Sequence, residues 1–306
     1  MKRRNFIQNG ILAGAAMGTG TSAFATSRSP KKTLAGMPFN LNYAPHSGMF
    51  KNLGGNDFID QIKFMHDEGF RSIEDNGMTG RSESDQNKIG ELLKKLGMDM
   101  GVFVVDKGGN GANTLAAGKK ENVDIFLKGC RQAVEVAKRV NAKWVTVVPG
   151  DFERRLPLAI QNANVIEALR RGAEILEPHG LVMVLEPLSD TPDLFLRDSS
   201  QTYMICKGVN SPSCKLLYDI YHMQKNEGNL IRNMGLTWDE IAYIQIGDNP
   251  GRNEPTTGEI NYKNIFKFVD SKGYKGILGM EHGNSKPGKE GELALIKAYR
   301  EEDAFK

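Results

Sequence analysis

The sequence is poor in cysteine and histidine, and this excludes several kinds of site. It has three cysteines and five histidines among 306 residues. Three cysteines cannot provide the framework of several bridges that holds small exported domains together. Cys206 and Cys214 could pair, but Cys214 precedes an apolar segment, and buried free thiols are the expectation for Cys130, Cys206 and Cys214.

The sequence also lacks a transmembrane-length apolar run, a tandem repeat and a low-complexity tract. Its short apolar stretch from Gly10 to Gly20 follows Lys2-Arg3-Arg4 and precedes Ala23-Phe24-Ala25. Charge, apolar core and cleavage site in this order predict a Tat-type export signal over residues 1–25. A linker over 26–36 and the fold over 37–306 would follow. We therefore expect a periplasmic protein with no membrane contact once the signal is removed.

The excess of basic charge is confined to this predicted signal. Lys2, Arg3 and Arg4 account for the whole formal charge of +3, which leaves the remainder of the chain neutral. A neutral chain offers no basic face for nucleic acid. The glycine-rich segment that begins at Gly108 lacks the Lys-Ser/Thr pair of a phosphate-binding loop, so it does not predict a nucleotide site.

What the sequence does contain is a regular alternation of apolar segments and helical patterns. The apolar segments are mostly continuous, as expected for parallel strands that helices cover. Eight strands followed by eight helical segments predict a single (β/α)8 barrel of the TIM type, with a doubly wound open sheet as the alternative. The predicted strands are Phe39–Tyr43, Arg71–Asp75, Asp99–Val104, Lys143–Val148, Leu181–Pro187, Lys215–Ile220, Ile241–Gly247 and Gly276–Glu281.

The last four predicted strands each end on a polar side chain that can bind a metal. These residues are Glu186, Asp219, Gln245 and Glu281. In a barrel of parallel strands they would converge at the C-terminal mouth, where active sites lie. Three carboxylates and an amide oxygen form a site for one hard divalent cation, Mg²⁺ or Mn²⁺. The alternative is a polar barrel mouth without a metal.

Neighbouring polar residues are candidates for substrate binding. His222 lies three residues beyond Asp219 and could bind a hydroxyl or carbonyl oxygen. Arg252 lies in the long polar loop after Gln245 and could hold a carboxylate or hydroxyls. Glu254 in the same loop and Glu74 at the end of the second strand complete the set, although Glu254 could instead organise the loop and Glu74 could form a structural ion pair.

Several of these motifs together resemble one known family. They are Leu-Glu186-Pro, Tyr-Asp219-x-x-His222, Ile-Gln245-Ile, Pro-Gly-Arg252-x-Glu-Pro-x-x-Gly-Glu259-Ile-Asn-Tyr and the terminal Glu281. Over roughly residues 36–300 the chain resembles the hydroxypyruvate isomerase family of xylose-isomerase-like TIM barrels. The resemblance implies that the quartet holds one divalent metal and that Glu186 and Glu281 also act as acid and base. The segment Asn42–His46 departs from the family pattern.

The expected function is a metal-dependent aldose–ketose isomerase that acts on a small hydroxy-carbonyl compound through an enediolate. A sugar epimerase, a dehydratase and a non-catalytic sugar-binding module are the alternatives. A phosphodiesterase of the AP-endonuclease type needs a metal cluster held by many histidines and a basic DNA face, and the composition argues against both. The expected partner is a small hydroxy-carbonyl or sugar substrate, and the sequence leaves a homo-oligomer open.

Overall fold

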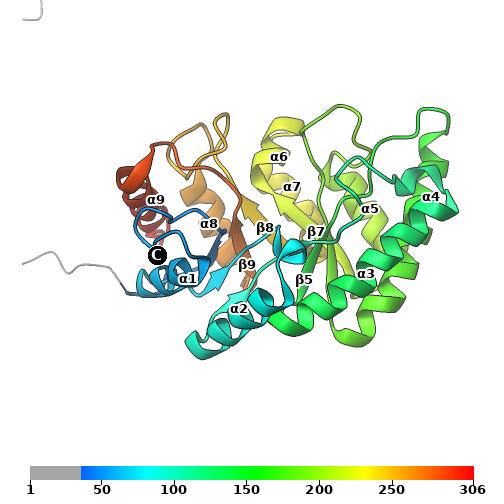
Figure 1. Ribbon diagram of the computed structural model, residues 1–306. Helices are drawn as coiled ribbons and strands as arrows, with labels where there is room; N and C mark the ends of the chain where they lie inside the picture. Colours follow the sequence, from blue (N-terminus) through cyan, green and yellow to red (C-terminus); the bar gives the residue numbers. More distant parts are fainter. Residues whose placement is uncertain (1–35) are drawn as a thin grey trace, which may run out of the picture. The chain divides into compact units, whose positions relative to one another are not determined.

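The first and the last strand of the described chain lie side by side. In the computed structural model, which describes residues 36–306, β1 (Asn42–Pro45) pairs in parallel with β9 (Ile277–Met280) (Figure 1). A closed barrel differs from an open doubly wound sheet in that its first and last strands pair with each other. The predicted export signal, residues 1–25, lies outside the described residues.

The remaining strands complete the ring. Ladders of parallel pairs run in the order β1-β9-β8-β7-β6-β5-β4, and β2 pairs with β3 in a second short ladder. A bridge between His46 and Glu74 joins the β1 side to the β2 side. The bounds are β2 Ser72–Ile73, β3 Asp99–Met100, β4 Phe103–Val104, β5 Trp144–Val147, β6 Val182–Leu185, β7 Cys214–Asp219 and β8 Ile241–Ile246. This confirms the predicted (β/α)8 barrel.

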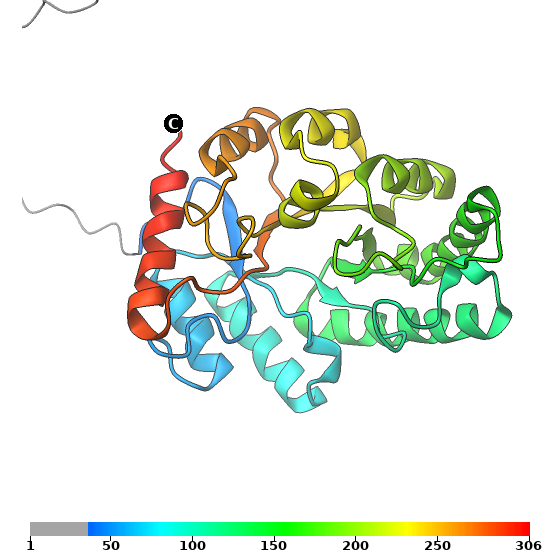
Figure 2. The same cartoon turned by 90° about the horizontal axis from the view of Figure 1, so that it is seen from above.

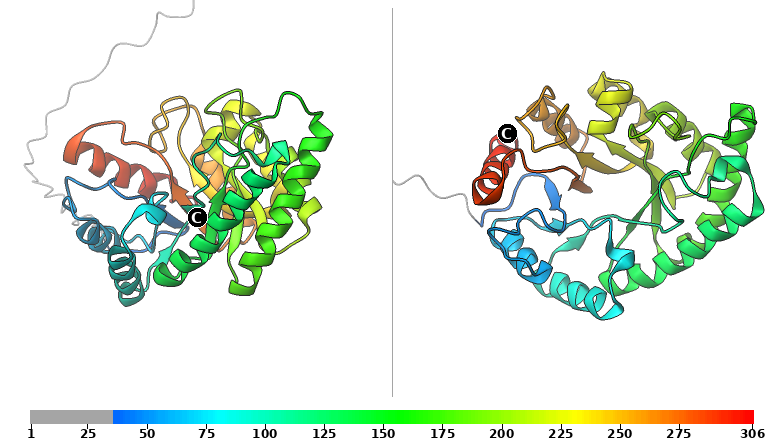
Figure 3. Two further views of the ribbon diagram at one scale, coloured as in Figure 1. Left: turned by 45° about the vertical axis from the view of Figure 1, so that its right-hand side comes forward. Right: turned by 45° about the horizontal axis from the view of Figure 1, so that its top comes forward.

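Helices surround the strands, as the view from above shows (Figure 2). Each strand position is followed by a helical segment, and the two further views show the same ring (Figure 3). Within residues 36–306, no helix is long and apolar enough to cross a membrane. The helices are α1 Phe58–Asp67, α2 Glu83–Leu96, α3 Lys120–Val140, α4 Leu158–Leu176, α5 Ser199–Val209, α6 Ile220–Asn226, α7 Leu230–Thr237, α8 Tyr262–Ser271 and α9 Gly288–Glu302.

Six strands differ from the sequence-based prediction only by one or two residues at their ends, and two differ further. The first strand was predicted at Phe39–Tyr43 but begins at Asn42, because the amides of Asn40 and Leu41 donate to the Asp303 carboxylate at 2.6 and 3.2 Å instead of to a neighbouring strand. The predicted third strand is interrupted after Met100, where the chain changes its pairing partner from β2 to β5.

The interior of the barrel is apolar at one end and polar at the other. Side chains from six strand positions form a buried cluster: Ala44, Val102, Val184, Leu217, Tyr243 and Ile277. Successive side chains alternate between the two faces of a strand, so a residue two positions further along points into the barrel again. From Val184, Leu217 and Tyr243, two positions lead to Glu186, Asp219 and Gln245. The alternation thus directs these three into the mouth.

Candidate functional site

The four predicted metal ligands lie at the C-terminal ends of β6, β7, β8 and β9. Asp219 and Gln245 are fully buried and are register partners across β7 and β8. Glu186 follows β6 and is 6% exposed. Glu281 follows β9, and a quarter of its side chain is exposed. The structure therefore brings the quartet to one end of the barrel, with Glu281 nearest to solvent.

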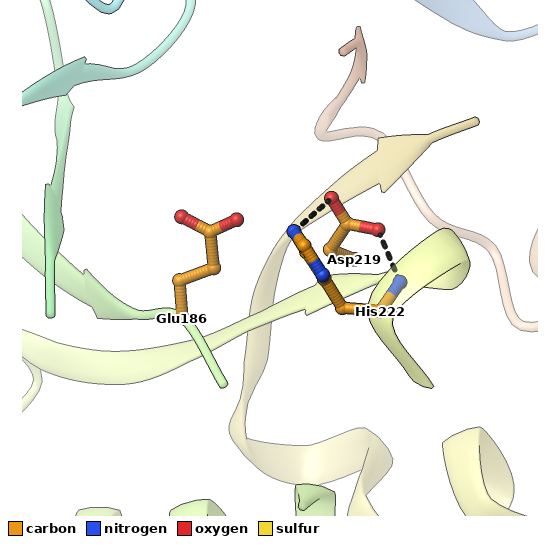
Figure 4. A group of neighbouring side chains, drawn as sticks. All are labelled: Glu186, Asp219 and His222. Carbon is orange, nitrogen blue, oxygen red and sulfur yellow. Dashed lines mark hydrogen bonds and ion pairs between the residues drawn. The ribbon is translucent and has the colours of Figure 1, made fainter. Parts of the chain in front are cut away.

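Glu186, Asp219 and His222 form the tightest group of potential ligands (Figure 4). One ligand atom from each of the three lies within 4.8 Å of the other two. Asp219 caps α6, since its Oδ1 accepts the amide N–H of His222 at 3.0 Å, and this hydrogen bond places the imidazole beside the carboxylate. His222 Nε2 lies 3.9 Å from Asp219 Oδ2.

Arg252 joins two members of the quartet. Its Nη2 donates to Glu281 Oε2 at 2.9 Å and to Asp219 Oδ2 at 3.3 Å, and its Nε donates to the backbone oxygen of Glu281 at 3.2 Å. The guanidinium lies over the Tyr221 ring, 5.0 Å from the centroid. A planar guanidinium is suited to such simultaneous contacts. Arg252 is thus a fixed cation at the mouth, and its substrate-binding role stays a prediction.

Glu281 is held from a second direction by a residue that the sequence did not single out. Asn76 Nδ2 donates to Glu281 Oε1 at 2.8 Å, so both carboxylate oxygens of Glu281 accept hydrogen bonds. The other polar atom of Asn76, Oδ1, is buried and has no partner among the described residues. Asn76 lies two positions beyond Glu74, and the same alternation that directs Glu74 inward could have identified it.

Glu74 lies beneath the quartet. It is fully buried, and its two oxygens accept hydrogen bonds from Gln245 Nε2 at 2.9 Å and from the Tyr243 hydroxyl at 2.8 Å. In the structure Glu74 thus contacts a predicted ligand, and its contact with a substrate stays a prediction. Burial raises the pKa of Glu74 to about 7, which the two hydrogen bonds oppose.

His222 has a defined orientation because Ser189 contacts one ring nitrogen. The amide N–H of Ser189 donates to Nδ1 at 3.1 Å, and the Ser189 hydroxyl lies 2.7 Å from the same atom. Burial lowers the pKa of His222, so the ring is neutral, and a neutral ring that accepts on Nδ1 carries its hydrogen on Nε2. This Nε2–H group suits a donor to a substrate oxygen better than a metal ligand.

The long loop after β8 is organised by two buried carboxylates. Asp248 accepts the amides of Asn249, Gly258 and Ile260 at 2.8–3.1 Å. Glu254 is 2% exposed and accepts the amide of Ser285 at 2.8 Å and its hydroxyl at 2.5 Å. Both contacts of Glu254 are internal to the protein, so it organises the loop that carries Arg252, which is the alternative stated from the sequence. Its contact with a substrate stays a prediction.

The buried carboxyl groups repel one another. Burial raises the pKa of Glu186 well above its usual range, and the nearby charges of Glu281 and Asp219 raise it further. Burial also raises the pKa of Glu281, and Arg252 opposes this effect. At this end of the described barrel Glu74, Glu186, Asp219 and Glu281 face a single guanidinium. Such a group of carboxylates is stabilised by any further cation that binds among them.

The donor atoms that remain free fit a hard divalent cation. Glu186 Oε1 and Gln245 Oε1 are buried side-chain oxygens without a hydrogen-bond partner in the described part of the chain. Unpaired buried polar atoms are costly and require an explanation, and one explanation is a bound ion. With carboxylate oxygens from Asp219 and Glu281, the set is made of oxygen donors, which Mg²⁺ and Mn²⁺ prefer. His222 Nε2 is also buried without a partner among the described residues, so its N–H group remains available as a hydrogen-bond donor.

A cavity of about 330 Å³ adjoins the site. Asn76, which contacts Glu281, forms part of its wall, and the rest comes from the segments around Thr79 and from Val104 to Asn110, together with Val148. Lys107 is held in this wall by the backbone oxygens of Gly109, Asn110 and Ala112, so it fastens the glycine-rich loop. The cavity volume is sufficient for a small-molecule ligand.

Comparison with known proteins identifies relatives of this chain. Residues 62–302 match the family model described as xylose isomerase-like TIM barrel. Hydroxypyruvate isomerase from Escherichia coli K12 is 33% identical over 159 residues, which are 51% of this chain and 62% of that protein. The 2-oxo-tetronate isomerase of Haemophilus influenzae is 33% identical over 233 residues, 74% of this chain and 87% of that protein. The first two curated relatives are thus matched over less than two thirds of their length.

Solved structures share the fold at lower identity. An L-ribulose 3-epimerase superposes with a TM-score of 0.70 at 18% identity and covers 85% of this chain and 92% of its own. A protein described as AP endonuclease, family 2, from Brucella melitensis superposes with a TM-score of 0.68 at 23% identity, over 86% of this chain and 99% of its own. At these identities the superpositions establish the barrel alone.

Proposed function

Since the chain belongs to the xylose isomerase-like TIM-barrel family, we propose that it is a metal-dependent isomerase that interconverts a small hydroxy-aldehyde and a hydroxy-ketone. The observation that carries the proposal is the pair of buried, unpartnered oxygens, Glu186 Oε1 and Gln245 Oε1, beside the carboxylates of Asp219 and Glu281. Relatives named hydroxypyruvate isomerase and 2-oxo-tetronate isomerase support a small hydroxy-carbonyl acid as the substrate.

Two glutamates provide the proton transfers that the reaction requires. Moving a carbonyl between adjacent carbons requires removal of a weakly acidic C–H proton and its return to the neighbouring carbon. Glu186 has a free oxygen that can accept a proton, and its raised pKa makes it a stronger base than an exposed carboxylate. Glu281 is oriented by Asn76 and Arg252 and serves as the second group in the transfer.

A divalent cation held by Glu186, Asp219, Gln245 and Glu281 would supply positive charge that stabilises the enediolate formed when the proton leaves. The protein adds its own donors to this. His222 presents Nε2–H to a substrate oxygen while Ser189 fixes the ring. Arg252, already a neighbour of Glu281 and Asp219, offers guanidinium N–H groups to a substrate carboxylate or hydroxyl.

The test is proton exchange coupled to isomerisation. The purified protein is incubated in D2O with Mn²⁺ or Mg²⁺ and, separately, with hydroxypyruvate, 2-oxo-tetronate and several free ketoses, and products are followed by NMR. We expect the isomeric hydroxy-aldehyde or hydroxy-ketone as the product, with deuterium at the carbon that receives the proton. We also expect a chelator to abolish its formation. Turnover that is unchanged after exhaustive chelation would refute metal dependence.

The same assay separates the alternatives. A product that keeps the carbonyl group in place but has one inverted stereocentre identifies an epimerase. Loss of water identifies a dehydratase. Binding of a sugar without deuterium incorporation identifies a binding module. Each of these results contradicts the proposed isomerase.

We also propose that the protein is exported in the folded state through its N-terminal segment. The support is the order of Lys2-Arg3-Arg4, the short apolar stretch and Ala23-Phe24-Ala25 in the sequence. Replacement of Arg3 and Arg4 by lysine should retain the protein in the cytoplasm, as cell fractionation and N-terminal sequencing would show. An unchanged distribution between the compartments would contradict this proposal.

A further inference from the structure

We propose that Glu74 is a positioning residue that turns the side-chain amide of Gln245 so that its oxygen, and not its nitrogen, faces the metal-binding side of the barrel. This inference rests on the proposed metal-dependent function. Glu74 does not contact the metal or the substrate in this proposal, because both of its oxygens accept hydrogen bonds from other side chains. It acts through one hydrogen bond, from Gln245 Nε2 to Glu74 Oε1 at 2.9 Å.

A glutamine amide needs such a partner because its two ends are nearly equal in size and opposite in hydrogen-bonding character. Both oxygens of Glu74 accept hydrogen bonds, Oε2 from the Tyr243 hydroxyl and Oε1 from Gln245 Nε2, so the carboxyl group takes up the nitrogen end of the Gln245 amide. The result is visible at Gln245: Nε2 is paired with Glu74, and Oε1 is buried without a partner among the described residues. In the reversed orientation a donor N–H₂ group would face the cation position.

The position of Glu74 is itself fixed on both sides. Its second oxygen, Oε2, accepts a hydrogen bond from the Tyr243 hydroxyl at 2.8 Å. Gly279 lies next to Gln245 in register on β9, and a Cβ atom at this position would overlap Glu74 Oε2. The missing side chain at residue 279 therefore leaves the space that the Glu74 carboxylate occupies. Glu74 follows β2, and β1 and β9 lie between this strand and β8, so the Glu74 side chain passes Gly279 to reach Gln245.

The space at Gly279 does more than allow close packing. It holds the Glu74 carboxylate, and both oxygens of this group accept hydrogen bonds, from Gln245 and from Tyr243. Gly101 leaves a second such space, since a Cβ atom at this position would overlap the Tyr243 hydroxyl. Two glycines thus accommodate one hydrogen-bonded chain, Tyr243–Glu74–Gln245. Groups that orient a metal ligand from behind typically change metal affinity about 10–100-fold when they are removed.

The test compares Mn²⁺ affinity in three variants, measured by EPR titration of free Mn²⁺ in the absence of substrate. Glu74→Met keeps the size but removes both acceptors, and we expect about 10–100-fold weaker Mn²⁺ binding. Glu74→Gln keeps an acceptor oxygen for Gln245 Nε2, and we expect it to restore most of the affinity. Tyr243→Phe removes only the bond to Oε2, and we expect less than about a threefold change.

The matched control is Glu292→Met. Glu292 is another buried carboxylate, 1% exposed, whose oxygens accept hydrogen bonds from Asn52 and Leu53 in the β1–α1 loop. This variant should lose stability but keep the wild-type affinity for Mn²⁺. Equal Mn²⁺ affinity of folded Glu74→Met and the wild type would overturn the inference, and so would an equal loss in Glu292→Met.

A second measurement does not depend on the metal and is made on the wild-type protein. In metal-free, ¹⁵N-glutamine-labelled wild-type protein, a carboxylate-bound Gln245 amide should give a downfield-shifted proton that exchanges slowly with water. The resonance is assigned by its loss in Gln245→Met. An amide that exchanges as fast as exposed glutamines would overturn the inference. If the wild type bound no Mn²⁺ while this resonance was protected, the proposed metal dependence would fail and the orientation of Gln245 by Glu74 would stand.

Discussion

Gly279 and Glu74 share one space inside the barrel: the carboxylate of Glu74 lies where a side chain on residue 279 would begin. A methyl group at 279 must displace that carboxylate and with it the hydrogen bond to Gln245. We predict that Gly279→Ala lowers the free energy of unfolding by about 1–3 kcal/mol, the usual cost of overfilling a packed interior. It should also weaken Mn²⁺ binding in the folded protein.

The control for this variant is Gly235→Ala. Gly235 lies in α7, and the nearest atom to an added Cβ is 3.8 Å away. Alanine here should stabilise the protein by about 0.4–1 kcal/mol, because it favours the helix. Urea unfolding and EPR titration measure both variants. Equal Mn²⁺ affinities of the two would contradict the role given to the space at Gly279.

Glu186→Gln and Glu281→Gln should each lower kcat by roughly 10²–10⁴-fold, the range for loss of a group that transfers a proton. The amide substitutes keep the shape, so circular dichroism should show an unchanged fold. Deuterium incorporation from D2O should fall with turnover in Glu186→Gln, because that variant lacks the proton acceptor. Activity within tenfold of the wild type in either variant would remove that residue from the mechanism.

Arg252→Lys should impair the enzyme although the charge is kept. A lysine ammonium cannot contact Asp219, Glu281 and a substrate in the planar arrangement of a guanidinium. Loss of one hydrogen bond to a charged group is worth about 1.5–3 kcal/mol. We therefore expect kcat/KM to fall roughly 10–150-fold, mainly through KM, in steady-state assays. A larger effect on kcat than on KM would assign Arg252 to the chemical step instead of substrate binding.

The lowered pKa of the buried His282 should make the free energy of unfolding depend on pH. Its Nδ1 lies 2.7 Å from the Gly283 oxygen and its Nε2 lies 2.8 Å from the Tyr299 hydroxyl, and burial lowers its pKa to about 3 from 6.5. The unfolded chain therefore takes up a proton below pH 6.5 that the folded protein does not. The contribution of His282 to the free energy of unfolding is complete above pH 6.5 and is lost as the pH falls towards 3.

At pH 5 this loss should reach about 2 kcal/mol for the one histidine. His282→Gln, which can still donate and accept a hydrogen bond, should remove that part of the dependence of the free energy of unfolding on pH. Urea midpoints of the metal-free proteins at pH 7.5 and pH 5 provide the measurement. Parallel slopes for wild type and variant would show that His282 does not cause the acid sensitivity.

The barrel and the quartet were predictable because their signals are local. Each strand is a short apolar run, and a polar residue at its end can be read without knowledge of its neighbours, as at Asp219 and Gln245. Strand alternation then directs these side chains inward. The same local rule placed Glu74 inside the barrel, but it could not reveal what Glu74 contacts.

The remaining features depend on residues that are distant in sequence. The role of Glu74 depends on Gly279, and a glycine in a strand does not indicate which side chain will fill its space. The true start of β1 depends on Asp303, which binds the amides of Asn40 and Leu41. These relations arise only when the ring of strands has closed.

That closure also brings the two ends of the described barrel together. Asn40 and Asp303 are hydrogen-bonded to one another, and Arg300 lies over the Phe39 ring. A short peptide could therefore join these ends, and the chain could be opened at an exposed helix–strand connection opposite the mouth. Such a circular permutant would present the same residues to the substrate in a new order along the chain, since a ring of strands has no inherent beginning.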